Sequence, residues 1–260
     1  MNVERIVIGM DFSESAIATM QWVAGSFGVA ADLILVHALE PDRHRPLPPV
    51  SYPTSAAAAL PEAAAERMRE IARLLPRGRT RVIVREGRGY TVLPDVAREV
   101  RADLVAVGAH GEGSPRSRLL GTTADRFVRS TRVPVLVGNG PADARVERLV
   151  VGVDGGSMTS TVLAWAQYAR EAFNARVSVV RAVDDPATVI LETAARDQAD
   201  LIIVGRRAVV AGIPTPLGRT LRHVLHQATC PVLVVTPKEE PLVFHQPDAT
   251  PGSRADRPPW

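Results

Sequence analysis

The chain has 260 residues, of which 46% are hydrophobic and 4% aromatic, which suits about two packed domains but offers few rings to stack on nucleic-acid bases. Its 31 basic and 28 acidic residues are scattered and leave a net charge of only +3, a pattern that argues against a nucleic-acid partner. The one cysteine excludes an internal disulfide, no apolar run reaches the roughly 18 residues of a membrane span, and the amino terminus lacks a signal-peptide pattern, so we expect a cytoplasmic protein without a membrane partner.

Short apolar runs alternate with helical patterns over the first 138 residues. The expected strands are residues 6–9, 33–37, 81–84, 104–108 and 133–137. The expected helices are residues 15–24, 61–75, 92–101 and 122–130. This alternation predicts a doubly wound parallel sheet, in an α/β fold of the Rossmann-like kind. The stretch 44–57 is rich in Pro and Ser and predicts a mobile surface loop.

The second half of the chain repeats the first in shortened form. Residues 5–11 align with 148–154, and residues 102–108 align with 199–205. The offset falls from 143 to 97 between these blocks, so the second copy lacks about 46 residues. We therefore predict two parallel-sheet domains, with five strands in the first and about four in the second.

The predicted boundaries follow from these repeats. The first domain spans residues 1–138 and the second spans residues 146–237, with a linker over 138–144. The tail 238–260 has several Pro residues and no periodicity, so we expect it to be disordered.

A glycine pattern after the fourth predicted strand indicates a phosphate site. Gly108 and Gly111 follow the strand, and Gly121 precedes the next helix. Glycine lets backbone N–H groups approach an anion and tolerates positive φ, while the helix start favours negative charge. Thr122 and Thr123 add hydroxyl donors.

This pattern, Gly108-x2-Gly111-x9-Gly121-Thr122, resembles the ATP-binding signature of the universal stress protein family. The stretches 9–15 and 35–38 are similar to that family's first strand and turn and to its second strand. The resemblance covers about 1–138 in full and 146–236 in part. It implies the sheet order 3-2-1-4-5, an adenine-nucleotide-binding fold, and ATP with Mg²⁺ as the ligand.

The resemblance also implies residue roles. Asp11 would hold the adenine or its ribose side, and Ala38 would contact the base through its backbone. The full implied set of nucleotide-binding residues is Gly9, Asp11, Ala38, Val107, Gly108, Gly111, Gly121, Thr122 and Thr123. The physical alternatives stay open, because Asp11 could cap the following helix and the glycines could be turn formers.

Other chemistry-bearing residues receive less specific interpretations. We expect His110 to be structural or adjacent to the nucleotide and not a general base. Arg116 and Arg118 could reach phosphate oxygens. His223 and His226 lack a nearby partner at metal-ligand spacing, so we expect no metal site.

Three further residues are expected to lie in the hydrophobic core. Cys230 precedes an apolar run and is expected to be a buried small hydrophobe. Trp22 and Trp165 lie on apolar helix faces and are expected in the core.

Three functions compete at this point. The favoured one is a nucleotide-dependent stress or regulatory protein that is not an enzyme, although slow ATP hydrolysis is compatible with it. The second is an ATP-hydrolysing or adenylating enzyme of a related fold. Residues 154–160 faintly resemble the pyrophosphate loop of such enzymes, but they lack its first Ser and its Asp. The third is a nucleotide-free scaffold.

The second copy predicts an internal partner for the first. The apolar strands 133–137 and 232–235 would need cover at the sheet edges, and pairing them gives an intramolecular pseudo-dimer, with homodimerisation of two chains also expected. Ala208 replaces a loop glycine and Arg219 replaces the Ser/Thr, although Asp154 persists. Because an edge strand and its helix are also missing, we expect this copy to bind no nucleotide.

Overall fold

The structure is a computed structural model that describes residues 2–27, 31–40, 54–75, 79–111, 120–140, 145–181, 184–206 and 216–237. The strands are β1 (Arg5–Gly9), β2 (Asp32–Leu39), β3 (Thr80–Glu86), β4 (Leu104–Gly108), β5 (Val135–Gly138), β6 (Arg148–Val153), β7 (Arg176–Arg181), β8 (Leu201–Gly205) and β9 (Val232–Val235). The helices are α1 (Glu14–Phe27), α2 (Thr54–Ala72), α3 (Gly89–Glu99), α4 (Thr122–Ser130), α5 (Thr159–Phe173), α6 (Pro186–Arg196) and α7 (Arg219–Gln227).

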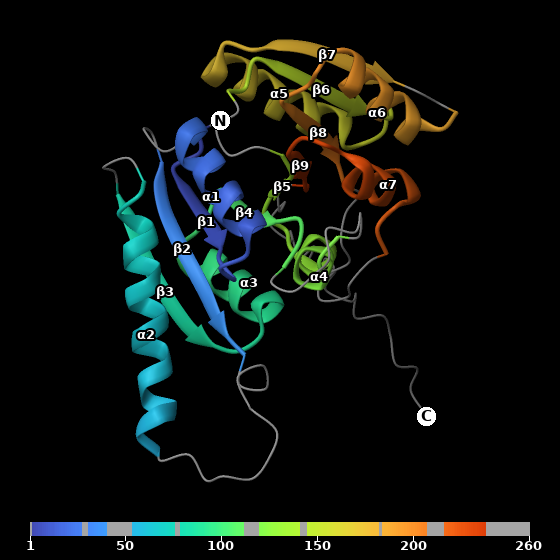
Figure 1. Ribbon diagram of the computed structural model, residues 1–260. Coiled ribbons are helices and arrows are strands. Elements are labelled where there is room, and N and C mark those ends of the chain that lie inside the picture. Colours follow the sequence, from blue (N-terminus) through green and yellow to red (C-terminus); the bar gives the residue numbers. More distant parts are fainter. Residues whose placement is uncertain are drawn as a thin grey trace, which may run out of the picture.

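The strands form one sheet in the order β3-β2-β1-β4-β5-β9-β8-β6-β7 (Figure 1). Strands β1 to β5 are mutually parallel, and strands β6 to β9 are mutually parallel. Each set is doubly wound, since the chain reverses its direction of travel across the sheet after β3 and again after β7. The fold is therefore α/β with two such units, of five and four strands, and the first has the expected order 3-2-1-4-5.

Corresponding strands of the two units pair in the same register, which explains the repeat in the sequence. Ile6 pairs with Leu104 in the first unit, and Leu149 pairs with Leu201 in the second. Strand β7 lies beside β6 as β2 lies beside β1. No described strand lies beyond β7, so the shortening removes the counterpart of the edge strand β3 and of helix α2.

Strands β5 and β9 pair in the antiparallel sense and join the two units; we call this pairing the β5–β9 seam. The paired positions are Val135 with Val234, Leu136 with Leu233, and Val137 with Val232. Side chains extend the seam at both ends. Asn139 Nδ2 donates to the Ala228 carbonyl at 3.2 Å, and Thr236 Oγ1 donates to the Arg132 carbonyl at 2.5 Å. The two copies thus pair within one chain through the two strands expected from the sequence.

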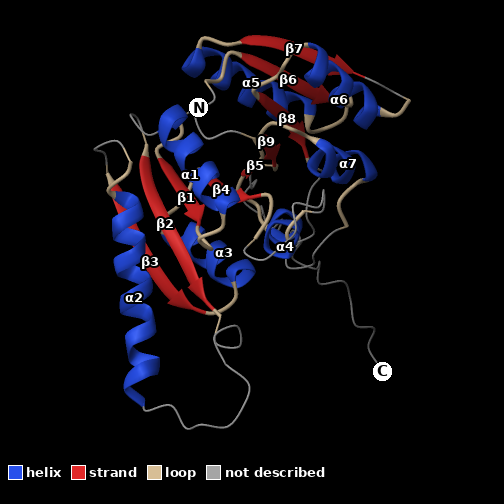
Figure 2. Cartoon of the chain, in the orientation of Figure 1, coloured by secondary structure: helices blue, strands red, loops and turns tan. Residues whose placement is uncertain are grey.

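Helices cover both faces of the sheet and enclose two apolar layers (Figure 2). Helices α1, α2 and α5 pack on one face, and helices α3, α4, α6 and α7 pack on the other. Strands buried on both faces need apolar residues in continuous runs, which accounts for the Val- and Ile-rich stretches of the sequence. Trp22, Trp165 and Cys230 are all buried, as predicted. The rings of Phe27 and Phe173 meet edge to face, with centroids 5.1 Å apart, and link α1 to α5.

The main secondary-structure difference concerns helix α2, which begins at Thr54, inside the stretch expected to be a loop. The alanine run at 56–59 favours helix and outweighs the neighbouring Pro and Ser. Residues 44–53, most of the linker, and the tail 238–260 lie outside the described residues. In the described part of the chain, no helix is both long and apolar enough for a membrane crossing.

Candidate functional site

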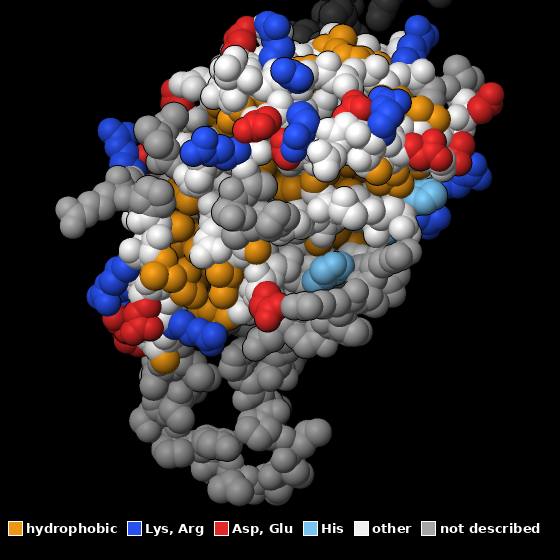
Figure 3. Space-filling model, turned by 45° about the horizontal axis from the view of Figure 1, so that its top comes forward, with side chains coloured by type: hydrophobic (Ala, Val, Ile, Leu, Met, Phe, Trp, Pro, Cys, Tyr) orange, Lys and Arg blue, Asp and Glu red, His pale blue; other side chains and the backbone are white. Residues whose placement is uncertain are grey.

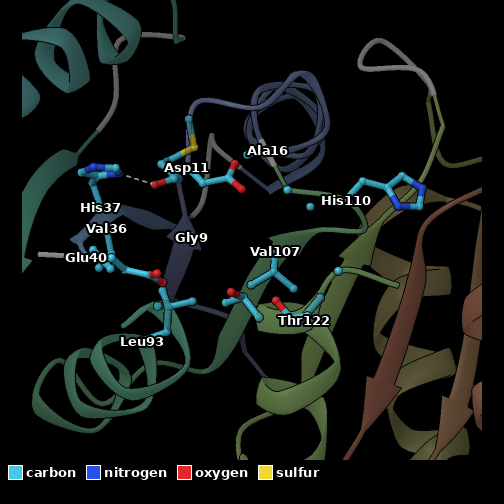
Figure 4. A pocket seen from close by; sticks show the side chains of 18 residues that line it. Gly9, Asp11, Ala16, Val36, His37, Glu40, Leu93, Val107, His110 and Thr122 are labelled. Carbon is cyan, nitrogen blue, oxygen red and sulfur yellow. Dashed lines mark hydrogen bonds between the residues drawn. The ribbon is translucent and has the colours of Figure 1, made fainter. Parts of the chain in front are cut away.

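One cleft lies at the carboxyl ends of β1, β2 and β4, where the strand order reverses direction, the usual ligand position in open α/β sheets. It holds about 950 Å³ of space, including its open mouth (Figure 4). All nine residues that the resemblance implied line this cleft, namely Gly9, Asp11, Ala38, Val107, Gly108, Gly111, Gly121, Thr122 and Thr123.

Asp11 connects the first turn to the glycine loop. Its Oδ1 accepts hydrogen bonds from the Ser13 backbone N–H at 3.0 Å and from Ser13 Oγ at 2.6 Å. Its Oδ2 faces Gly111, where a Cβ would approach that oxygen to 3.0 Å. Ser13, and not Asp11, caps α1, because the Ala16 N–H donates to Ser13 Oγ at 3.1 Å.

The glycines are needed for close approach and not for positive φ, so that part of the sequence analysis is wrong. None of Gly108, Gly111 and Gly121 has a left-handed backbone. A Cβ on Gly108 would lie 2.8 Å from the Ala16 nitrogen, so this glycine lets α1 begin against the end of β4. A Cβ on Gly121 would lie 3.3 Å from the Ala109 carbonyl oxygen, which accepts a hydrogen bond from the Gly121 N–H at 2.7 Å.

The amino-terminal ends of two helices reach the cleft. Helix α4 begins at Thr122, and no described side chain caps it. Helix α3 begins at Gly89, where a Cβ would lie 3.0 Å from the Thr123 side chain. Uncapped N–H groups and the positive ends of two helix dipoles give this wall of the cleft a preference for anions.

The opposite wall is built around a buried histidine. His37 Nδ1 lies 2.7 Å from the Met10 carbonyl oxygen, in hydrogen-bonding geometry. The Phe12 ring packs against the His37 ring at a centroid distance of 4.6 Å, and the Arg67 guanidinium lies over Phe12 at 4.2 Å. The side chain of His110 points away from Asp11 and His37 in Figure 4.

Several residues that line the cleft were not predicted from the sequence, including Met10, Val36, Glu40, Gly89 and Leu93. Glu40 and Gly89 carry a detectable signal, since each follows the end of a strand where parallel sheets place their ligands. Arg116 and Arg118 lie outside the described residues, so their predicted reach toward phosphate is not placed.

The second unit has a corresponding but larger cleft, with about 1780 Å³ of space including its mouth. Arg181 of the second unit corresponds to His37 of the first. Arg181 follows the residue of β7 that pairs with Gly152, and His37 follows the residue of β2 that pairs with Gly9. Arg219 begins α7 at the position that Thr122 has in α4. The first cleft is therefore smaller, and it carries the His37 imidazole and the Thr122 hydroxyl where the second carries guanidinium groups.

Two expectations about the second unit have different outcomes. Asp154 is retained, and its Oδ1 accepts a hydrogen bond from the Gly156 N–H at 2.8 Å. Ala208 lies outside the described residues, and the positive-φ argument against it fails because the corresponding Gly111 is not left-handed.

No described cluster of three or more His, Cys, Asp or Glu side chains has the arrangement of a metal site. His223 and His226 lie beside Arg219 and Arg222 on α7, and two cations are poor neighbours for a bound metal ion. On the face shown in Figure 3, basic and acidic side chains of the described residues lie interspersed.

The geometry defines a two-unit α/β protein with a cleft at the carboxyl ends of the strands of its first unit. The sequence model of the universal stress protein family matches residues 2–138 and 177–236. The chain belongs to the universal stress protein family. The match is interrupted between residues 139 and 176, and it resumes in β7, beside which the counterpart of β3 is absent from the described sheet.

Solved structures share the architecture over nearly the whole chain. A universal stress protein from Archaeoglobus fulgidus DSM 4304 is similar with a TM-score of 0.68 at 16% identity, covering 91% of this chain and 99% of that one. A functionally unknown protein from Pseudomonas aeruginosa PAO1 has a TM-score of 0.62 at 14% identity, covering 90% and 93%. These similarities establish the two-unit fold.

Proposed function

We propose that the first cleft binds ATP, accompanied by Mg²⁺, and that the protein is a nucleotide-dependent regulatory protein in stress responses. The observation that carries this proposal is the convergence of Asp11, Gly111 and the uncapped start of α4 in one cleft. The Asp11 carboxylate can accept hydrogen bonds from hydroxyl groups of a ligand. The start of α4 attracts the anionic part of a ligand.

The shape of the cleft supports a ligand whose two ends differ chemically. Val36, Leu93 and Val107 offer apolar contact suited to the face of a base. Thr122 and Thr123 add hydroxyl groups to the backbone N–H groups at the start of α4. A nucleotide has this polarity, with an apolar-faced base, a ribose and an anionic phosphate chain.

The direct test is mass analysis of the supernatant after heat denaturation of the purified protein, followed by calorimetric titration of the nucleotide-free chain. We expect an adenine nucleotide at about one per chain. A chain that carries no nucleotide and gives no heat with ATP would be the scaffold, and the proposal would fail.

A matched pair of variants tests the site. Asp11→Ala should weaken ATP binding by about 1–3 kcal/mol, because it removes a charge-assisted hydrogen bond. Asp154→Ala makes the same change at the corresponding position of the second unit and should leave ATP affinity unchanged. Equal effects of the two variants would contradict the assignment of the first cleft.

We propose regulation and not catalysis as the role of the bound nucleotide. His110, the histidine nearest the glycine loop in sequence, is directed away from Asp11 (Figure 4). Steady-state phosphate release measures the alternative directly. Turnover faster than about one per second would favour the ATP-hydrolysing enzyme.

A further inference from the structure

Arg206 follows β8 of the second unit, but its side chain reaches into the first. It is 5% exposed, and its guanidinium donates hydrogen bonds to the carbonyl oxygens of Val128, Arg129 and Thr131. The Arg206–Thr131 contact measures 3.3 Å. These three carbonyls lie at the carboxyl end of α4, so one side chain of the second unit holds the end of a helix of the first.

A buried cation at this place has a physical reason. The last carbonyls of a helix lack partners within the helix and carry its negative dipole end, so a guanidinium both pairs with them and balances their charge. Burial, followed by the charge of Arg129, lowers the pKa of Arg206 to about 10. The side chain therefore stays charged at neutral pH inside the interface.

The contact breaks the symmetry between the units. Ala109 follows β4 at the position that Arg206 has after β8, and a methyl group donates no hydrogen bond. At the carboxyl end of α7, the Ala228 carbonyl instead accepts a hydrogen bond from the neutral Asn139 amide. The charged contact thus runs from the second unit to the first, which contains the smaller cleft.

Helix α4 connects this contact to the cleft. It has nine residues, and Phe127 and Val128 are fully buried on the sheet. Thr122 and Thr123 at its start line the first cleft, while Val128 and Arg129 near its end accept the Arg206 hydrogen bonds. Such a short packed helix moves as one body, so fixing its carboxyl end also fixes the N–H groups at its start.

We propose that Arg206 is a positioning residue for the nucleotide site of the first unit. The second unit contributes to that site by holding the carboxyl end of α4, the end opposite to the one that lines the cleft. This inference rests on the proposed function, since it assigns the positioned N–H groups to phosphate. The second unit acts through the helix and touches no nucleotide itself.

Calorimetric titration with MgATP of three full-length variants tests the inference. Arg206→Met keeps the apolar stem, and we expect it to weaken binding roughly 3- to 30-fold without touching the ligand. Arg206→Lys keeps a charge but loses the planar fork, so its affinity should fall between Arg206→Met and the original chain. Asn139→Ala removes the corresponding neutral contact at α7 and should leave affinity within about twofold.

Amide hydrogen exchange of the nucleotide-free protein provides a readout that does not depend on ATP. In Arg206→Met, the amides of Asp125 to Thr131 should exchange faster, while those of α3 stay unchanged. Unaltered ATP affinity in folded Arg206→Met and Arg206→Lys would overturn the inference, as would an equal loss in Asn139→Ala. If the original chain binds no ATP, the proposed function fails, and unchanged exchange in α4 would then also exclude positioning by Arg206.

Discussion

Phe12 and Gly155 occupy the same position in the two units, and both have a left-handed backbone, with φ of 64° and 75°. Each directly follows the aspartate that both units carry at the corresponding position, Asp11 or Asp154. A large side chain in this conformation costs roughly 1–2 kcal/mol, a cost that glycine avoids. The first unit therefore carries local strain beside Asp11, and the second does not.

Gly155→Ala should lower the free energy of unfolding by about 1 kcal/mol or more, because alanine disfavours a backbone with φ of 75°. Gly25→Ala is the matched control, since a Cβ there meets no atom of the described residues within 4 Å and the residue lies in α1. That change should stabilise the protein by about 0.5–1 kcal/mol. Urea unfolding measures both, and a stabilising Gly155→Ala would contradict the left-handed turn.

Gly111→Ala should reduce ATP affinity with little change in thermal stability. The added Cβ would lie 3.0 Å from Asp11 Oδ2, so the carboxylate must shift away from its position in the cleft. We expect a loss of about 1–2 kcal/mol in binding free energy by calorimetry. Gly218→Ala in the second cleft is the control, because a Cβ there has no described atom within 4 Å. Comparable losses in both variants would argue against the close contact of Gly111 with Asp11.

Titration with ATP should saturate at one site per chain. In the second cleft, Arg181 and Arg219 stand at the positions of His37 and Thr122, and the counterparts of β3 and α2 are absent from the described sheet. Restoring one hydroxyl by Arg219→Thr should not create a second site, because Arg181 still stands at the position of His37. Two sites of similar affinity in the original chain would show that the second unit is functional.

The Cys230 thiol should make stability fall at high pH. Burial raises its pKa from 9.0 to about 12, so between these values the unfolded chain releases a proton that the folded chain retains. The unfolded state then gains stability, and the free energy of unfolding falls by about 1 kcal/mol on reaching pH 10. Urea unfolding at pH 7.5 and pH 10 measures this fall, which Cys230→Ala should lack. Equal pH dependence in the two chains would refute the assignment.

The parts of the fold that could be predicted from the sequence are those set by local pattern. The end of a strand, the glycine loop and the start of a helix between Gly108 and Thr122 could be predicted from the sequence alone, because buried strands and helix starts require particular residue types at short range. The repeat gave the relation between the units, because Ile6–Leu104 and Leu149–Leu201 follow one register.

The parts that could not be predicted depend on contacts between distant segments. The reason for Gly108 is the nearby start of α1, and that approach distance exists only in the folded chain. Arg206 reaches carbonyls 75 to 78 residues away across the seam, and in the sequence it is one of many loop arginines. The boundaries of the two domains as independent units, and the expected homodimer, remain predictions.

The β5–β9 seam also decides how the protein responds to dilution. A one-unit chain that paired through such a strand would separate into free subunits as its concentration fell, exposing Leu136 and its neighbours. Here both strands belong to one polypeptide, so each meets the other at an effective concentration in roughly the millimolar range, set by the connecting segment. Each chain therefore forms the contact between Arg206 and α4 by itself, whatever the concentration of the protein in the cell.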